Sequence, residues 1–341
     1  MWRFYYTVFS LIVALILAEG ALRLLGYLPY KEPEPSNKIT SIPGPLFCSE
    51  SILGYRNCSG KFQVTLNDDL TYSWTIDSAD GWRTVPNKMV FINANAPEIH
   101  IHGCSFFAGM GVNDNEVLSA YLQQLVGTNF RVVNKSIPGH GMTVQLRQLQ
   151  QAVENDRKPA VAVFSIASFH LPRNSGAPEY LNKFQVIKDR PMQFLCSRFE
   201  DNGEINFFIK DVEPKRLIGS RHFAAVHLFS AVLDNYRSSK TDQLQLQLSL
   251  MDSAYNLAVR NGVIPLFVLI TNDEHSAPIV AHGATKGYEI VQSMVDYNDT
   301  AFNLMPHDGH PNARAHKAYA YEILNELKQS GQFLGLDTPG Q

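Results

Sequence analysis

The chain has 341 residues, of which 45% are hydrophobic and 18% charged, and its formal net charge is −3. This balance is that of a globular protein rather than a disordered one. The length suffices for one large domain with attachments or for two smaller domains. Because no run of five Lys or Arg occurs, the sequence excludes the electrostatic signature of a nucleic-acid-binding protein.

The chain begins with an almost uninterrupted apolar run at residues 4–18, preceded by Arg3. A helix of this length spans ~22 Å, less than the ~30 Å hydrocarbon core of a bilayer, and adding 2–3 and 19–22 makes a marginal span. One interpretation is a cleaved signal peptide with Ala18-Glu19-Gly20 as a loose small-x-small site. We favour an uncleaved anchor over 1–28, single-pass in the inner membrane, because the helical pattern continues past that site. The following domain then lies on the periplasmic or extracellular side.

Residues 29–50 are predicted to form a linker, since 30–45 are rich in Pro, Glu, Ser and Lys. Alternating apolar residues at 62–66 and 72–76 predict a small N-terminal β extension over 51–95. Cys48 and Cys58 either form a disulfide in an exported domain or stay unpaired as small apolar residues. The absence of a CxxC pattern in the sequence argues against a structural zinc site.

Residues 96–330 are predicted to form an α/β domain. Strand-like runs at 99–102, 131–134, 161–166 and 265–270 alternate with helical runs, which indicates a parallel sheet with helices on both faces. The stretch 171–240 breaks this rhythm with mixed aromatic and charged residues. We interpret it as an insertion, either a cap that shapes the substrate site or a peripheral subdomain.

A serine stands where the first of these strands ends. Gly103 breaks the strand at 98–102, Ser105 follows, and a helical pattern runs from 117 to 125. Ligands of open α/β sheets bind at such strand ends. A serine hydroxyl needs a base to become a nucleophile, and the predicted loop 307–312 before a helix at 313–327 offers Asp308 and His310. His307 and His316 are rival bases, and the same cluster is an alternative, weaker candidate for a metal site.

Several segments resemble the conserved blocks of the SGNH (GDSL-like) hydrolases. GCSF at 103–106 with GMGVND at 109–114 is similar to the first block, NKSIPGHG at 134–141 to the second, and DGHPN at 308–312 to the last. DGWR at 80–83 resembles the lead-in of membrane-anchored bacterial members. The resemblance covers roughly 53–326. It implies a three-layer α/β sandwich around a flavodoxin-like parallel sheet, without a cofactor or a catalytic metal.

The resemblance also implies residue roles. Ser105 is the nucleophile, His310 the general base and Asp308 its orienting carboxylate, while the N–H groups of Ser105 and Gly139 bind the oxyanion. Two departures stand out. Phe169-His170 occupies the third block, where Asn-Asp is expected, so His170 or Asn174 is a candidate replacement for the oxyanion donor. Asp308 and His310 are separated by one residue, where many members have two.

The expected function is hydrolysis of an O-acyl ester through an acyl-enzyme. By family analogy the substrate is an acylated small molecule or an O-acetyl group on a surface carbohydrate. A polysaccharide O-acetyltransferase using the same site is the first alternative. A non-catalytic binding or assembly factor of the same fold is the second, because the third block lacks its asparagine.

Overall fold

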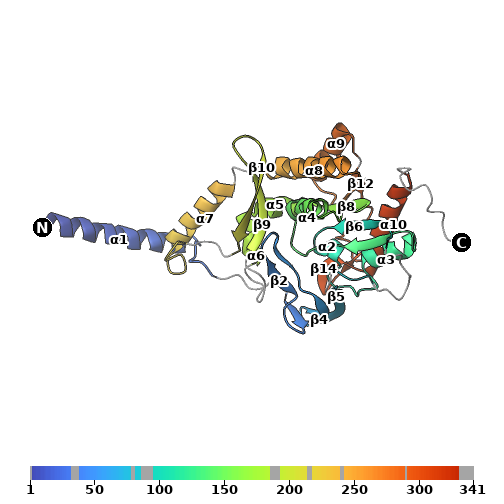
Figure 1. Ribbon diagram of the computed structural model, residues 1–341. Coiled ribbons are helices and arrows are strands. Elements are labelled where there is room, and N and C mark those ends of the chain that lie inside the picture. The colour runs from blue at the N-terminus through green and yellow to red at the C-terminus, as the bar shows by residue number, and fades with distance from the viewer. Residues whose placement is uncertain are drawn as a thin grey trace.

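In this computed structural model, the described residues are 2–31, 38–77, 81–85, 95–184, 193–212, 217–238, 242–288 and 290–329. The chain starts with α1 (Trp2–Leu24), which is apolar along its length and has no buried residue. Figure 1 shows α1 projecting away from the rest of the protein. It is long and apolar enough to cross a membrane. Residues 330–341 and Asp80 of the predicted lead-in lie outside the described residues.

A five-stranded parallel sheet forms the centre, in the order β12-β11-β8-β6-β7. Its strands are β6 (Glu98–His102), β7 (Arg131–Asn134), β8 (Val161–Ile166), β11 (Ile264–Leu269) and β12 (Ile290–Gln292). All six residues of β8 are buried, as expected of a central parallel strand covered on both faces. Read from the β7 edge, the strands follow the chain order 2-1-3-4-5, which is the flavodoxin-like order. The predicted fold class is therefore confirmed, with β11 shifted by one residue.

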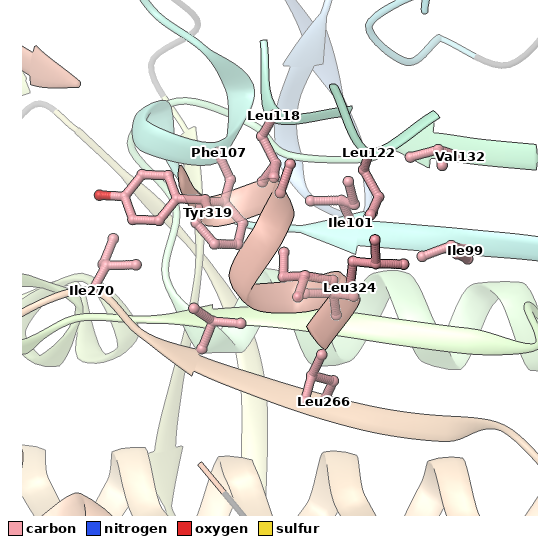
Figure 2. Close-up of a cluster of buried hydrophobic side chains, with 14 of the residues drawn as sticks. Ile99, Ile101, Phe107, Leu118, Leu122, Val132, Leu266, Ile270, Tyr319 and Leu324 are labelled. Carbon is pink, nitrogen blue, oxygen red and sulfur yellow. The ribbon is translucent and has the colours of Figure 1, made fainter. Parts of the chain in front are cut away.

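Helices cover both faces of this sheet. One face carries α3 (Leu118–Val126) and α10 (Ala313–Gln329), and the other carries α4 (Met142–Glu154), α8 (Gln243–Arg260) and α9 (Ser276–Lys286). Figure 2 shows Leu118, Leu122 and Leu324 packing against Ile99 and Ile101 on the first face. Each such side chain contributes about 1.5–3 kcal/mol when fully buried. The two cores fix the sheet and hence the position of its carboxyl edge.

The N-terminal extension is a second, antiparallel unit, with β1 (Ile39–Ile42), β4 (Gly60–Leu66) and β5 (Leu70–Ile76) in the order β1-β4-β5. Asn67 and Asp68 both have positive φ, as a tight hairpin turn requires. A separate hairpin of β2 (Phe47–Glu50) and β3 (Gly54–Asn57) is closed by a Cys48–Cys58 disulfide. The linker prediction is thus wrong for 39–50, where pairing with later strands overrides the polar, Pro-rich composition.

The predicted insertion forms several elements around the carboxyl edge of the sheet. They are α5 (Leu171–Ser175), α6 (Pro178–Phe184), the hairpin of β9 (Gln193–Phe199) and β10 (Ile205–Asp211), and α7 (Ala224–Ser238). The short η1 (Ser168–His170) immediately precedes them. Helix α5 packs on α8 and β9, and β9 also contacts β3. Helix α7 instead contacts α1, and it lies between α1 and the rest of the protein in Figure 1.

The segment predicted as a loop at 307–312 contains a strand. β14 (Asp308–Pro311) pairs antiparallel with β13 (Asn303–Leu304). Gly309 and Pro311 suggested a loop because both residues disfavour strands, but the pairing with β13 outweighs that preference. Side chains two residues apart on a strand share a face. The strand therefore brings the side chains of Asp308 and His310 to the same side.

Candidate active site

Ser105 begins α2 (Ser105–Ala108), a single turn that follows β6. The backbone turns tightly here: a Cβ on Gly103 would come within 2.7 Å of Phe107 Cβ and Ser165 Oγ. Ser105 is 8% exposed, and its hydroxyl has no hydrogen-bond partner within the described ranges. Its N–H group belongs to the first turn of a helix and likewise lacks a described acceptor.

Asp308 and His310 form a hydrogen-bonded pair on β14. Asp308 Oδ1 accepts a 2.7 Å bond from the His310 N–H and also contacts His310 Nδ1. Burial alone would raise the pKa of Asp308, but its bonds to His310 outweigh that effect and hold the pKa below the usual value. The carboxylate thus fixes the tautomer with a proton on Nδ1 and leaves Nε2 as the basic nitrogen. Asp308 and His310 can bond with a single residue between them because their side chains lie on the same face of β14.

The imidazole of His310 lies beside the turn that carries Ser105. Its ring centroid is 5.6 Å from that of Phe106, the residue after Ser105, and β14 contacts α2. His310, the candidate base, and Ser105, the candidate nucleophile, thus lie in neighbouring elements, although 205 residues separate them in the sequence. This is the juxtaposition on which the predicted chemistry depends.

The rival histidines are engaged elsewhere. His307 Nδ1 lies 2.6 Å from Asp69 Oδ2 at the turn between β4 and β5. His316 is buried on α10, and its Nδ1 accepts a 3.2 Å bond from the Leu118 N–H. Burial, with the charges of Arg83 and His310, lowers the pKa of His316 to about 3, so this residue stays neutral. Among the described residues, no three His, Cys, Asp or Glu side chains converge on a potential metal position.

Gly139 lies next to Ser105 because the chain continues in parallel beyond β6 and β7. Ile137 N donates to Gly103 O at 3.0 Å. Gly139 lies two residues after Ile137, and Ser105 lies two residues after Gly103. Gly139 has a φ of 90°, a value that favours glycine. Its N–H donates to no acceptor in the part of the chain that the structure describes.

Two tyrosines fix the orientation of this glycine. The Tyr55 hydroxyl donates to Pro138 O, and its ring stacks on His140 with centroids 4.2 Å apart. Because a trans peptide is planar, with C=O and N–H on opposite sides, holding the Pro138 carbonyl also aims the Gly139 N–H. The Tyr180 hydroxyl donates to Gly139 O. Tyr55 and Tyr180 were missed by sequence analysis, since no local signal links them to the 134–141 block.

The sheet order, the two covering helix layers and the serine at the end of the first parallel strand together define the architecture. The chain has a flavodoxin-like three-layer α/β fold, the fold that the resemblance to SGNH hydrolases implies. No family model matches the sequence, and no curated protein matches it.

Solved structures similar to the chain include an esterase, EstA, from Pseudoalteromonas sp., with 13% identity over 69% of this chain and 99% of that one and a TM-score of 0.40. A member of the lipolytic G-D-S-L family from Veillonella parvula DSM 2008 has 10% identity over 68% and 98%, with a TM-score of 0.39. A family two carbohydrate esterase from Clostridium thermocellum, solved with cellohexaose, has 10% identity over 72% and 68%, with a TM-score of 0.38. At these values the likeness carries no argument, and the fold and the residue roles rest on the topology and the geometry of the chain itself.

The third block of this SGNH-like domain is built differently from the expected pattern. Phe169 packs its ring on Phe106 at 5.2 Å and offers no hydrogen-bond donor. His170 is fully buried, and neither of its ring nitrogens has a partner among the residues described. Burial, together with the charge of Arg173, lowers the pKa of His170 well below its usual value, so the ring is neutral.

Asn174 is occupied by bonds within the helix layer. Its Oδ1 accepts from Thr143 N at 3.1 Å, and its Nδ2 donates to Gln247 Oε1 at 2.7 Å. The amide is buried and joins α5 to α4 and α8. Asn174 therefore serves helix packing in this structure, and sequence proximity to the block suggested a role that its contacts do not support.

Arg173, in α5, contacts both the third block and the second. Its Cζ is 4.5 Å from the Phe169 ring centroid and 5.2 Å from that of Tyr180. Nη1 lies 3.4 Å from His140 O, and Nε is buried without a described partner. The guanidinium thus joins Phe169 of the third block to the backbone of His140 in the second. A cation with unused donors at this position can stabilise developing negative charge.

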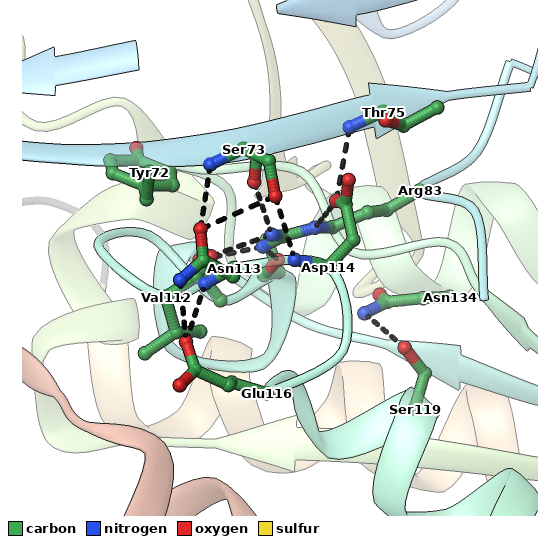
Figure 3. A network of polar contacts seen from close by, with 12 residues as sticks. Tyr72, Ser73, Thr75, Arg83, Val112, Asn113, Asp114, Glu116, Ser119 and Asn134 are labelled. Atoms are coloured by element: carbon green, nitrogen blue, oxygen red, sulfur yellow. Dashed lines mark hydrogen bonds and ion pairs between the residues drawn. The ribbon is translucent and has the colours of Figure 1, made fainter. Parts of the chain in front are cut away.

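Arg83 holds the backbone that follows Ser105. Its guanidinium donates to Ala108 O and Gly109 O at 2.6 Å each, and its Nε bonds Asp114 Oδ1 at 3.1 Å. Figure 3 shows this network between β5 and the loop that leads to α3. Arg83 also stacks over Trp74 at 4.2 Å and is 2% exposed. Arg83 thus holds the backbone carbonyls of the residues that follow the turn carrying Ser105.

A cavity of about 570 Å³ lies apart from this site, along β6, β7 and α4. Its lining includes Trp82, His100 and Lys135, but not Ser105 or His310. The Trp82 ring lies 5.1 Å from Lys135 Nζ. Trp82 therefore belongs to this cavity and not to the candidate catalytic group.

Proposed function

We propose that the chain is a serine-dependent acyl-ester hydrolase with Ser105 as its nucleophile. One observation carries this proposal. The Asp308–His310 pair lies beside the turn of Ser105. The N–H of Ser105 and that of Gly139, two residues beyond the Ile137–Gly103 bond, have no described acceptor. Nucleophile, oriented base and oxyanion donors are the parts that acyl transfer requires.

The geometry supports a two-step reaction. His310 Nε2 takes the proton of the Ser105 hydroxyl while Oγ attacks the ester carbonyl carbon, whose π electrons move onto the carbonyl oxygen. The tetrahedral intermediate collapses, the alcohol leaves with the proton from His310, and the acyl group stays on Ser105. Water then loses a proton to His310, attacks the acyl-enzyme and releases the carboxylic acid. Asp308 orients the imidazole and stabilises its charged form in both steps.

The oxyanion is bound by the N–H groups of Ser105 and Gly139 and by the guanidinium of Arg173. The two amides match the donors implied by the first and second blocks. We assign the role of the third block's asparagine to Arg173 and not to Asn174, because the Asn174 amide is bonded to Thr143 and Gln247 whereas the Arg173 Nε has no described partner. The neutral ring of His170, whose nitrogens also lack described partners, is the alternative donor. A guanidinium adds a full positive charge, which compensates for looser geometry.

The substrate is proposed to be an O-acetyl ester on a surface carbohydrate, as the family resemblance implies. Export supports this assignment: the Cys48–Cys58 disulfide fits an oxidising compartment, and α1 is a membrane span by length and composition. The protein is then a single-pass inner-membrane enzyme with its catalytic domain in the periplasm.

Hydrolysis of p-nitrophenyl acetate by the purified full chain tests the catalytic proposal. Replacing Ser105 by alanine is expected to abolish turnover above the uncatalysed rate, because the acyl-enzyme cannot form. Ser51→Ala, at an exposed serine of the β2–β3 turn, is the matched control and keeps full activity. Equal rates for the Ser105→Ala and unsubstituted proteins would leave only the non-catalytic binding or assembly role.

The same acyl-enzyme serves an O-acetyltransferase when a sugar hydroxyl replaces water as the attacking group. Incubating the enzyme with an acetyl donor and an added glycan separates the two activities. Acetate released without acetylated glycan, detected by mass spectrometry, is the expected result. Acetyl groups that appear on the glycan only with intact Ser105 would assign the transferase instead.

A further inference from the structure

Helix α7 is attached directly to the end of the predicted anchor. Glu19 Oε1 accepts from Ala224 N at 2.8 Å and Glu19 Oε2 from Ala225 N at 3.0 Å. These N–H groups belong to the first turn of α7, so the carboxylate of α1 caps that helix. Arg23 adds a 2.8 Å bond from Nη2 to His222 O and a 2.7 Å contact from Nε to Glu19 Oε1.

An apolar surface surrounds this junction. Ile218 is 100% exposed and Phe229 57%. Ala225, Phe229 and Val232 follow helical spacing and so lie along one side of α7. The exposed apolar residues of this surface, called here the α7 patch, are Leu217, Ile218, Phe223, Phe229 and Val232.

The patch continues the apolar surface of α1. Leu24, Leu25 and Leu28, at and just after the end of α1, are also exposed, and α1 and α7 are in contact. Leaving such a surface in water is unfavourable by about 25 cal/mol for each Å² of apolar area. If α1 crosses a membrane, its apolar residues up to Ala18 lie in lipid, and the bilayer surface is then close to the place where the patch begins.

We propose that the α7 patch is a second membrane contact, seated in the outer interfacial layer of the bilayer that α1 crosses. This inference rests on the proposed anchor role of α1 and is independent of the catalytic proposal. A second copy of the chain or another protein is the alternative occupant. Lipid is favoured because the patch is continuous with α1 and is tied to it by Glu19 and Arg23, which lie where α1 leaves the apolar core.

Two consequences follow. The Glu19 cap exists only while α1 stays attached, so it agrees with the uncleaved anchor and not with cleavage after Ala18 or Gly20. The bilayer also restrains the catalytic domain at two points, since α7 lies between α1 and the rest of the protein (Figure 1). The orientation of the active site relative to the membrane is then fixed rather than free.

Spin labelling of the full chain in phosphatidylcholine–phosphatidylglycerol nanodiscs tests the proposal. Nitroxides are attached to Ile218→Cys and Phe229→Cys, with Leu11→Cys on α1 as the lipid reference and Asp201→Cys, exposed in the β9–β10 turn, as the water reference. Power saturation gives the ratio of collisions with O₂ to collisions with a water-soluble nickel complex. The native free cysteines, Cys104 and Cys196, are buried, and the unsubstituted protein measures their background.

The ratio at 218 and 229 is expected to lie well above that at 201 and to approach that at 11. Values at 218 and 229 equal to the water reference, with a lipid value at 11, would overturn the patch proposal and leave the anchor intact. Low collision rates with both reagents, or dipolar broadening between labels, would overturn it in favour of a protein partner. A water-like value at 11 would overturn both the anchor and the patch.

Discussion

Replacing Arg173 by methionine tests the least expected part of the site. Methionine keeps an unbranched side chain between the rings of Phe169 and Tyr180, which lie 4.5 and 5.2 Å from the guanidinium carbon, but it removes the charge and every donor. Losing one oxyanion donor lowers kcat by about 10²–10³, or about 2.7–4 kcal/mol of transition-state stabilisation. A guanidinium that acts on the transition state should leave KM nearly unchanged.

The expected effect on stability is much smaller. Each cation–π contact contributes about 0.5–1 kcal/mol at an accessible site, so the two contacts of Arg173 together contribute about 1–2 kcal/mol. That loss leaves a domain of ordinary stability, about 5–15 kcal/mol, folded. Activity and stability are thus predicted to respond very differently to the same substitution.

The assay is p-nitrophenyl acetate hydrolysis with kcat and KM measured separately, alongside the urea midpoint. Arg198→Met is the matched control, because Arg198 also lies over an aromatic ring, that of Phe208 at 5.2 Å, on an exposed part of β9. It is expected to keep full activity. Arg173→Lys should retain part of the rate, since it keeps the charge. A kcat for Arg173→Met within about threefold of the unsubstituted value, well below the loss typical of a donor, would refute the oxyanion role.

Three further predictions concern the groups that support the site. Tyr55→Phe releases the Pro138 carbonyl and is expected to lower kcat about two- to tenfold, corresponding to one hydrogen bond of about 0.5–1.5 kcal/mol; an unchanged kcat would show that the Gly139 peptide is held without it. Arg83→Lys cannot reproduce the forked contacts behind Ser105 and is expected to destabilise the domain by about 3–5 kcal/mol in urea unfolding, whereas a loss below about 1 kcal/mol, typical of exposed ion pairs, would contradict the clamp. Because burial lowers the pKa of His316 to about 3, the unfolded chain binds the extra proton first, and stability is lost as pH falls below the unfolded pKa of about 6.5. His316→Asn, which keeps an acceptor for the Leu118 N–H, should reduce that slope by about 1.4 kcal/mol per pH unit between those limits, and an unchanged slope would mean that His316 is already protonated in the folded protein.

Local sequence patterns predicted the central part of the fold because its strands are short apolar runs between helical segments. The strands at 131–134 and 161–166 have the predicted bounds. Ser105 could be placed at the end of a strand because Gly103 interrupts the apolar run. Gly139 was proposed only through the resemblance of 134–141 to the second block, and the Ile137–Gly103 bond shows that this segment runs beside the segment that carries Ser105.

Contacts between distant segments could not be predicted in this way. Tyr55 bonds a carbonyl 83 residues further along, and Glu19 caps a helix 205 residues away. The strand at 308–311 depends on its pairing with 303–304, because its own Gly and Pro favour a loop. No sequence signal pointed to Arg173, because its contacts with Phe169, Tyr180 and His140 depend on how α5 packs in the folded chain.

Mass spectrometry of the full chain after reaction with a fluorophosphonate tests the central claim most directly. The account predicts a single covalent adduct on the peptide that contains Ser105, formed rapidly by the unsubstituted protein and lost in Ser105→Ala. Labelling should slow by orders of magnitude in His310→Ala, because the hydroxyl then lacks its base. An adduct on another residue, or equal labelling rates with and without His310, would contradict the proposed nucleophile and its activation.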